Sequence, residues 1–140
     1  LTHNKPETFF MFLPLWANVP MPEAAKKDLI ENYLLNPRKF FGPIPFPSVA
    51  YDAPSYDPAG YWRGRAWSHF SCWLTEVLWR EGYQSEADEA ANRIMAWQQM
   101  WDFRENMNTD PSELFPKGFP HYNWGSAAYC YFSERLYRCD

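Results

Sequence analysis

The sequence predicts an all-α protein of about four helices joined by two long loops. Three features of its 140 residues indicate this class. Four segments repeat apolar residues at the three- and four-residue spacing of one helix face. Two segments between them, residues 36–64 and 102–123, lose that period and carry turn-forming Pro, Gly, Asp and Asn. The 8 Trp, 9 Tyr and 11 Phe indicate an ordered chain, since disordered chains contain few aromatic residues.

The first predicted helix runs from Pro22 to Leu35. Pro22 suits a first helical position, and Pro37 ends the helix. Its apolar face carries Ala25, Leu29, Ile30, Tyr33 and Leu34. The loop that follows, residues 36–64, is long for a compact domain, and connections of this length are usually functional.

The second and third predicted helices follow each other closely. The second runs from about Arg65 to Glu81, and Gly82 provides a left-handed stop. In the third, Ser85 and Asp88 form a capping-box-like start, and the helical period continues to Trp101. Two helices joined by so short a connection are expected to be antiparallel neighbours.

The last predicted helix covers Trp124 to Tyr137, with Asn123 as its expected cap. The loop at residues 36–64 enters helix two, and the loop at 102–123 leaves antiparallel helix three. The adjoining ends of these loops should therefore lie side by side. This geometry predicts that residues 61–67 lie near residues 101–108.

Charge and composition narrow the ligand classes. The formal net charge of −4 argues against binding to nucleic acid or to an anionic membrane surface, which require clustered Lys and Arg. The apolar run from Thr8 to Ala17 is too short to span a bilayer, and it lacks the flanks of a signal peptide. Aromatic rings with a polar edge complement the flat face and hydroxyl rim of a sugar, so carbohydrate is the natural ligand class.

Metal and cofactor sites are not indicated by the sequence. The three cysteines include no Cys-x-x-Cys pair, so we interpret Cys72, Cys130 and Cys139 as buried or free thiols. The three histidines lack metal-ligand spacing. They are His3, His69 and His121. We expect no metal and no cofactor.

Five segments in order resemble a known family, and together they cover nearly the whole chain. The segments are Phe12–Ala17, Pro47–Asp52, Tyr61–Trp67, Phe103–Asn108 and His121–Ala127. They are similar to the C-terminal part of glycoside hydrolase family 63 and its relatives, the processing α-glucosidase and mannosylglycerate hydrolase group. The resemblance implies an (α/α)6 toroid and an inverting reaction with two carboxylates.

The resemblance assigns roles to residues of both loops. The segment Phe-Arg-Glu-Asn-Met-Asn aligns Glu105 with the general base of the family, and Arg104 or Arg63 nearby would favour its charged form. The remaining aligned residues are expected to contact the sugar or the water: Tyr61, Trp62, Arg63, Trp67, Asn106, Asn108 and Trp124. One of Trp62 and Trp67 has a core position as its alternative. Arg65 stands where the family has Pro, and Met107 where it has Tyr, which puts the substrate in question more than the reaction.

The resemblance also implies that residues 1–140 are an incomplete C-terminal portion of the catalytic domain. A toroid needs twelve helices, and the family's general acid is an Asp in an upstream segment. The expected partners are therefore an oligosaccharide or small glycoside and the remaining N-terminal part of the barrel. The chain begins Leu1-Thr2-His3, which suggests an internal start, a processed product or an artificial boundary and leaves localisation open.

Three hypotheses follow from the sequence. The first is a part of an inverting glycosidase that cleaves an α-glucosidic or α-mannosidic bond and is inactive alone. The second is a non-catalytic carbohydrate-binding or interaction module that uses the aromatic residues. The third is a structural remnant whose exposed helix faces require a partner.

Overall fold

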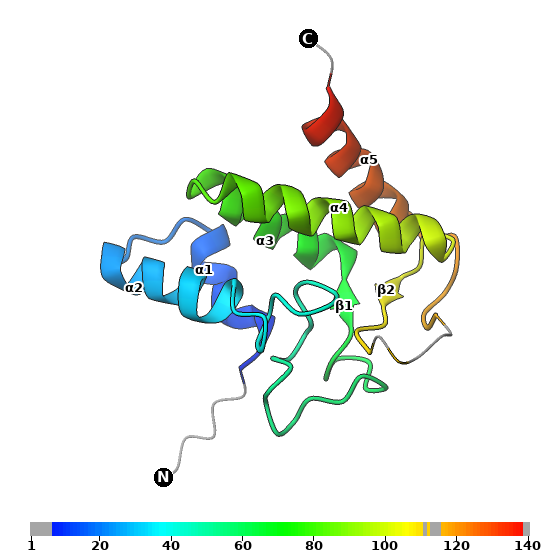
Figure 1. Ribbon diagram of the computed structural model, residues 1–140, viewed down its shortest axis with the longest axis horizontal. Coiled ribbons are helices and arrows are strands. Elements are labelled where there is room, and N and C mark those ends of the chain that lie inside the picture. Colours follow the sequence, from blue (N-terminus) through cyan, green and yellow to red (C-terminus); the bar gives the residue numbers. More distant parts are fainter. Residues whose placement is uncertain (1–6, 111, 113–115, 139–140) are drawn as a thin grey trace.

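The computed structural model describes residues 7–110, 112 and 116–138. Five α-helices dominate these residues, which confirms the all-α class and a segment of an α/α barrel (Figure 1). The α-helices are α1 (Leu13–Trp16), α2 (Glu23–Asp28), α3 (Ser68–Arg80), α4 (Gln84–Met100) and α5 (Asn123–Tyr137). The shorter elements are the 3-10 helix η1 (Phe9–Phe12), the π-helix η2 (Leu29–Leu34), and the strands β1 (Ala66–Trp67) and β2 (Asn106–Met107).

The N-terminal region contains two helical parts. The predicted helix at residues 22–35 is present as α2 followed directly by η2, and Pro22 stands one position before α2 rather than in its first turn. The apolar run before it forms η1 and α1, which the periodicity did not predict. These short elements bury Phe9, Phe12 and Leu15 against the rest of the core.

The α3–α4 hairpin is the centre of the fold, and α5 packs against both of its helices (Figure 1). Gly82 has a φ of +88° between α3 and α4, as its predicted role requires. Strand β1 leads into α3, β2 follows α4, and the two strands pair antiparallel with Ala66 opposite Met107. This pairing confirms the expected antiparallel hairpin and brings the two long loops together.

Three predicted helix starts were wrong. Helix α3 begins at Ser68 rather than near Arg65, because Ala66 and Trp67 pair with β2. Ser85 lies inside α4, which has no side-chain cap. The Asp88 carboxylate instead accepts hydrogen bonds from Trp79 Nε1 at 2.7 Å and Gln84 Nε2 at 2.8 Å. Asn123 is the first residue of α5 and not its cap.

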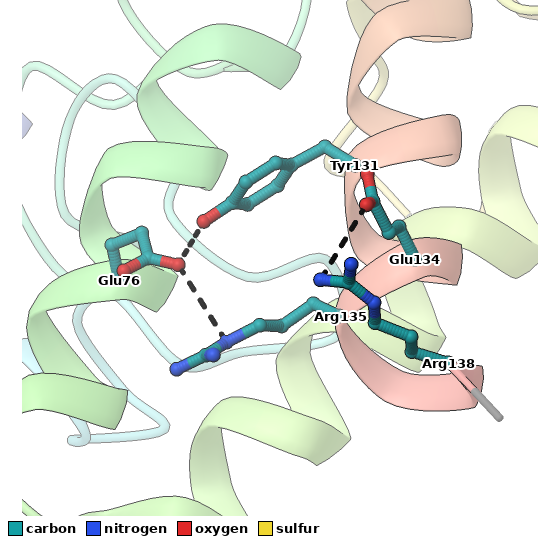
Figure 2. Close-up of a pocket in the computed structure, with 5 residues that line it drawn as sticks. All are labelled: Glu76, Tyr131, Glu134, Arg135 and Arg138. Carbon is teal, nitrogen blue, oxygen red and sulfur yellow. Dashed lines mark hydrogen bonds and ion pairs between the residues drawn. The ribbon is translucent and has the colours of Figure 1, made fainter. Parts of the chain in front are cut away.

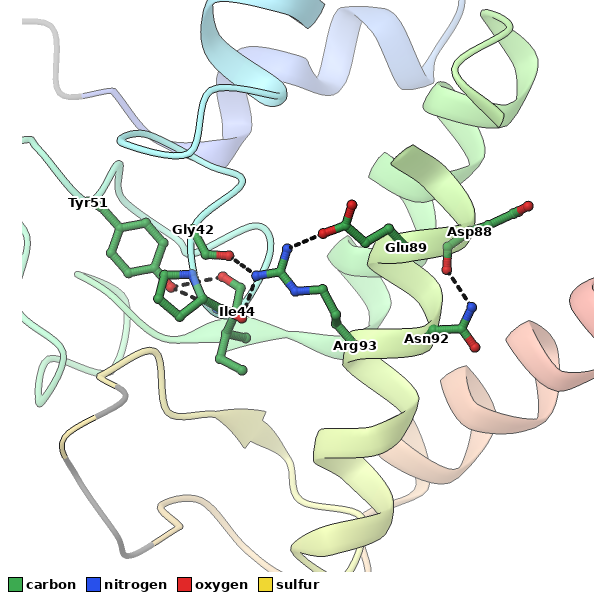
Figure 3. Close-up of polar contacts among 8 residues, drawn as sticks. Gly42, Ile44, Tyr51, Asp88, Glu89, Asn92 and Arg93 are labelled. Carbon is green, nitrogen blue, oxygen red and sulfur yellow. Dashed lines mark hydrogen bonds and ion pairs between the residues drawn. The ribbon is translucent and has the colours of Figure 1, made fainter. Parts of the chain in front are cut away.

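The loop at residues 36–64 is fastened to α4 by an arginine (Figure 3). Arg93 Nη2 donates to the carbonyls of Gly42 and Pro43, the second at 2.6 Å, while Nη1 pairs with Glu89 at 3.1 Å. In the same loop Tyr51 donates to the Ile44 carbonyl at 2.8 Å. The loop is thus an ordered part of the fold, and its far end can position side chains.

Two observations bear on the predicted environment and thiols. Across the residues that the structure describes, no helix has the length and apolarity needed to cross a membrane. Cys72 is half-buried and Cys130 is exposed, and both are free thiols, as predicted. Burial raises the pKa of the Cys72 thiol to about 12, so this thiol is unreactive near neutral pH. Cys139 lies outside the described residues.

Candidate active site

The two long loops meet beside the β1–β2 pair, and each contributes a predicted site residue there. Glu105 directly precedes β2, and its backbone amide donates to the Phe119 carbonyl at 3.0 Å. Tyr61 lies in the turn before β1. That turn is closed at Gly64, where an added Cβ would meet the backbone of Asp57. The predicted proximity of residues 61–67 and 101–108 is confirmed by this pairing.

Glu105 is buried and accepts a hydrogen bond on each carboxylate oxygen. Its exposed fraction is 8%. Tyr61 donates its hydroxyl to Oε1 at 2.5 Å, and Asn106 Nδ2 donates to Oε2 at 3.3 Å. The hydrogen bond to Glu105, together with desolvation, raises the pKa of Tyr61 to about 12. Tyr61 therefore remains a protonated donor at neutral pH, and it orients the carboxylate.

The Glu105 carboxylate lines a cavity of about 480 Å³, here called the Glu105 cavity. Its lining residues are Tyr61, Arg65, Glu105, Gly118 and Phe119. The cavity therefore combines a carboxylate, a phenol and a guanidinium with one exposed aromatic ring. This composition suits a polar ligand with hydroxyl groups and an apolar face.

The predicted aromatic residues divide into exposed and buried rings. Tyr61 and Trp62 are 44% and 46% exposed, whereas Trp67 is only 1% exposed. The Trp62 ring stacks on the Trp67 ring with centroids 3.9 Å apart and an interplanar angle of 9°. Trp67 also meets the edge of Tyr61 at 4.7 Å. Of the two tryptophans, Trp67 is the core ring, and it supports the two exposed ones.

Trp124 extends this aromatic group from the N-terminal end of α5. It is 38% exposed, and its ring lies 6.3 Å from Trp67. His69 packs against it with ring centroids 4.4 Å apart. Desolvation lowers the pKa of His69, so its ring is neutral at neutral pH. We call Tyr61, Trp62, Trp67 and Trp124 the aromatic wall.

The model of the mannosylglycerate hydrolase MGH1-like glycoside hydrolase domain matches residues 2–125 of the chain. The chain belongs to this family. The match covers both loops, the β1–β2 pair and the start of α5, so the Glu105 cavity lies within the family domain. No curated protein matches the sequence.

Solved structures of similar fold come from Thermus thermophilus. An uncharacterized conserved protein matches with 22% identity and a TM-score of 0.77, and a glycoside hydrolase family 63 mannosylglycerate hydrolase in complex with glucose matches with 23% and 0.75. The same enzyme with Tris and D-glycerate gives 21% and 0.76. Each match covers 91% of this chain but only 29–32% of the other chain, so this member of the family spans about a third of their length.

Arg63 and Arg104, the two arginines expected beside Glu105, pair with other groups. Arg63 is exposed and pairs with Asp57 at 2.7 Å. Arg104 donates to the carbonyls of Trp101 at 2.9 Å and Gly118 at 3.0 Å. Arg65, the residue directly before β1, lines the Glu105 cavity instead.

The two predicted asparagines have different surroundings. Asn106 is fully buried and contacts Glu105. Asn108 is also buried, and its Oδ1 accepts the backbone amide of Asp110 at 3.1 Å. Asp57, one of the turn-forming residues of the first loop, accepts a hydrogen bond from the backbone amide of Ala59 at 3.0 Å. Asn106 therefore lies beside Glu105, and Asn108 contacts the backbone of the following loop.

Three residues of the cavity were not predicted as site residues: Arg65, Gly118 and Phe119. Arg65 carried a signal, because it departs from the family pattern. Gly118 has a φ of +82°, and an added Cβ would lie 3.0 Å from Asn106 Nδ2. No residue pattern in the aperiodic loop distinguished Gly118 or Phe119 from its neighbours.

A second cavity, of about 400 Å³, opens between α3 and α5 (Figure 2). We call it the Glu76 cavity. Its charged side chains are paired with one another: Tyr131 donates to Glu76, Arg135 lies 4.0 Å from Glu76, and Arg138 lies 3.9 Å from Glu134. Among the described residues, no group of three or more His, Cys, Asp and Glu could hold a metal ion.

Proposed function

We propose that this chain supplies the water-activating half of an inverting glycoside hydrolase site, with Glu105 as the general base. The observation that carries the proposal is the Glu105 carboxylate in the cavity wall. It is buried, its two oxygens accept hydrogen bonds from Tyr61 and Asn106, and no cation pairs with it among the described residues. A base must keep a free lone pair for the proton of water, and this carboxylate has lone pairs left.

The reaction requires a second carboxyl group. In an inverting hydrolase an acid protonates the leaving oxygen while the base deprotonates water on the opposite ring face, and about 6.5–9.5 Å separates the two groups. Glu105 would take the water proton, the water oxygen would bond to the anomeric carbon, and the bond to the leaving oxygen would break. Glu105 is the only acidic residue that lines its cavity within the described part of the chain. We therefore propose that the proton for the leaving oxygen comes from an acid outside this chain, as the family resemblance implies.

The aromatic wall supports a sugar as the ligand. Tyr61 lines the Glu105 cavity, and Trp62 and Trp124 of the same aromatic group are also partly exposed. Exposed aromatic rings can stack on the C–H face of a pyranose. The family name and the fold relatives, one bound to glucose and one to D-glycerate, support an α-glucoside or α-mannoside as substrate. The assembled enzyme, meaning this chain together with the polypeptide that supplies the acid, is the form we expect to be active.

Proton NMR of the first-formed sugar tests this proposal in the assembled enzyme. With an α-linked substrate, inversion releases the β-anomer before mutarotation, so the β-anomeric signal should appear first. An α-anomer as the first product would exclude direct displacement by water, which is the step proposed for Glu105, and would indicate a double displacement through a covalent intermediate.

A binding module is the second candidate, because the Glu105 cavity has one carboxylate and is lined by the exposed rings of Tyr61 and Phe119. Titration of the 140-residue chain with α-linked gluco- and manno-oligosaccharides, followed by tryptophan fluorescence, separates the candidates. Binding at millimolar or lower concentration by a chain whose assembled form shows no hydrolysis would favour the module.

A further inference from the structure

Arg65 contacts both side chains that donate hydrogen bonds to Glu105. Its Nη1 donates to Asn106 Oδ1 at 3.2 Å, and its guanidinium carbon lies 5.8 Å from the centre of the Tyr61 ring. Nη2 donates to the carbonyl of Ala59 at 3.2 Å, which fastens the guanidinium to the turn before β1. We infer that Arg65 is a positioning residue, which holds Asn106 and Tyr61 in the orientation that presents two donors to the Glu105 carboxylate.

The chemistry of the Asn106 amide makes this role specific. An amide has an acceptor end and a donor end, and a carboxylate such as Glu105 accepts well only from the donor end. Arginine has donors and no acceptor, so Arg65 stabilises the acceptor end of Asn106 on its own side. The opposite end, Nδ2, then faces Glu105 Oε2 at 3.3 Å. A half-turn of the amide would place Oδ1 against the carboxylate and Nδ2 against the cation.

Gly118 confines the same amide from another side. An added Cβ on Gly118 would lie 3.0 Å from Asn106 Nδ2 and 3.2 Å from Asn106 Cγ. Asn106 is also fully buried. The amide is therefore enclosed by Arg65, Glu105 and Gly118, and a change at any of the three should be detected at Asn106.

Charge considerations agree with a positioning role. Among the described residues, Arg65 has no carboxylate partner, and both of its hydrogen bonds go to neutral oxygens. Arg63, two positions earlier, is paired with Asp57 and does not line the cavity. A cation that donates to neutral groups beside an active carboxylate stabilises the arrangement without neutralising the base by direct contact.

The first test reads the Asn106 side chain in the 140-residue chain by ¹⁵N–¹H NMR. Arg65→Met removes the donors but keeps the apolar stem, and we expect the Asn106 side-chain amide signals to shift toward those of a free amide and to exchange faster with solvent. Arg65→Lys keeps a cation with donors only and should stay close to wild type. Arg38→Gln, at an exposed arginine outside the cavity, is the matched control. Unchanged Asn106 signals in Arg65→Met, or equal effects of Met and Lys, would overturn the inference.

Gly118→Ala is a second variant that does not depend on the folding of Arg65→Met. The added methyl should displace the Asn106 amide while Arg65 remains intact, so the same signals should shift. An unperturbed Asn106 in this variant would show that the amide is not confined as described.

The second test is kinetic, and it rests on Glu105 being the base. In the assembled enzyme, Arg65→Met should lower kcat by about tenfold, the loss expected when a hydrogen bond near the reacting group is removed, with little change in KM. A rise in KM alone, confined to substrates with an anionic substituent, would identify Arg65 as a substrate-binding group and overturn the positioning role. If Glu105→Gln leaves turnover unchanged while Arg65→Met alters the Asn106 signals, the proposed function fails and the positioning role remains.

Discussion

Two tyrosine–glutamate pairs of the molecule share one contact and differ in everything around it. Tyr61 donates to Glu105 in one cavity, and Tyr131 donates to Glu76 in the other. Glu105 is 8% exposed, whereas the side chain of Glu76 is 38% exposed and lies 4.0 Å from Arg135. Beside Glu105 are exposed aromatic rings, while the Glu76 cavity is lined mainly by charged residues (Figure 2).

The surroundings of the two carboxylates distinguish a candidate catalytic group, Glu105, from an ion-paired surface group, Glu76. In the Glu76 cavity the charges neutralise one another, which is the usual state of a solvated ion pair on a helix surface. Glu105 instead accepts hydrogen bonds from two neutral donors, Tyr61 and Asn106, in a partly enclosed space. We therefore propose chemistry at the Glu105 cavity and a structural role for the Glu76 cavity, and the following substitutions test this proposal.

Removing each carboxylate in turn should give the largest contrast. Glu105→Gln should lower kcat in the assembled enzyme by about 10²–10⁴-fold, because a general base contributes a factor of this size. Glu76→Gln should leave kcat within about twofold, since it lies between α3 and α5 and pairs with surface residues. Initial rates with an α-mannoside or α-glucoside measure both. Equal losses of kcat in the two variants would contradict the different roles proposed for Glu105 and Glu76.

The tryptophans beside Tyr61 should contribute unequally to stability. Trp67→Ala removes a buried ring that supports Tyr61 and should lower the free energy of unfolding by about 3–5 kcal/mol. Trp62→Ala should cost about 1 kcal/mol or less, because this ring is nearly half exposed, and should mainly weaken sugar binding. Urea unfolding and oligosaccharide titration of each variant measure the two effects. Similar destabilisation by both substitutions would contradict the division into a core ring and a binding ring.

Removing the two hydroxyls should have a smaller effect on turnover. Tyr61→Phe should lower kcat by about 10–100-fold, because a hydrogen bond to a charged group is worth about 1.5–3 kcal/mol. The pKa of Tyr61 is raised to about 12, so the ratio of wild-type to variant kcat should stay constant across neutral pH. Tyr131→Phe is the matched control and should leave kcat unchanged. A Tyr61→Phe enzyme with wild-type kcat would show that the Glu105 carboxylate needs no orienting phenol.

The smallest expected effect is a pH dependence of stability from His69 behind the aromatic wall. Desolvation lowers its pKa below 6.5, so the unfolded chain binds a proton at a pH where the folded chain does not. The contribution of neutral His69 to the free energy of unfolding is therefore fully present above pH 6.5. It is lost as the pH falls toward the lowered folded pKa, by at most about 1.4 kcal/mol per pH unit. His69→Gln should remove this part of the slope in urea unfolding. An unchanged slope would place the acid sensitivity elsewhere, for example among the Glu76 charges.

Helical periodicity was sufficient to predict the main helices and the α3–α4 hairpin. It did not predict η1, α1 or the two strands, because elements of two to four residues are shorter than a repeat. The capping box at Ser85 was wrong because Asp88 is engaged by Trp79, a contact between two helices that no local pattern contains. Periodicity thus predicted the central parts of the helices, whereas tertiary contacts determined where the elements begin and end.

The site was predicted in outline through the family resemblance. Glu105, Tyr61 and Asn106 lie together, whereas Arg65 rather than Arg63 lines the Glu105 cavity. The sequence Tyr-Trp-Arg-Gly-Arg-Ala-Trp does not reveal which arginine and which tryptophan face inward. That depends on the turn closed at Gly64 and on the pairing of β1 with β2.

Chemical rescue of Glu105→Ala in the assembled enzyme tests the central claim most directly. Azide attacks the anomeric carbon without a base, so it should restore bond cleavage in this variant and give a glycosyl azide of anomeric configuration opposite to that of the substrate. Glu76→Ala should show no response to azide. Wild-type hydrolysis by Glu105→Ala without azide, or a glycosyl azide that retains the substrate configuration, would contradict the assignment of Glu105 as the water-activating base.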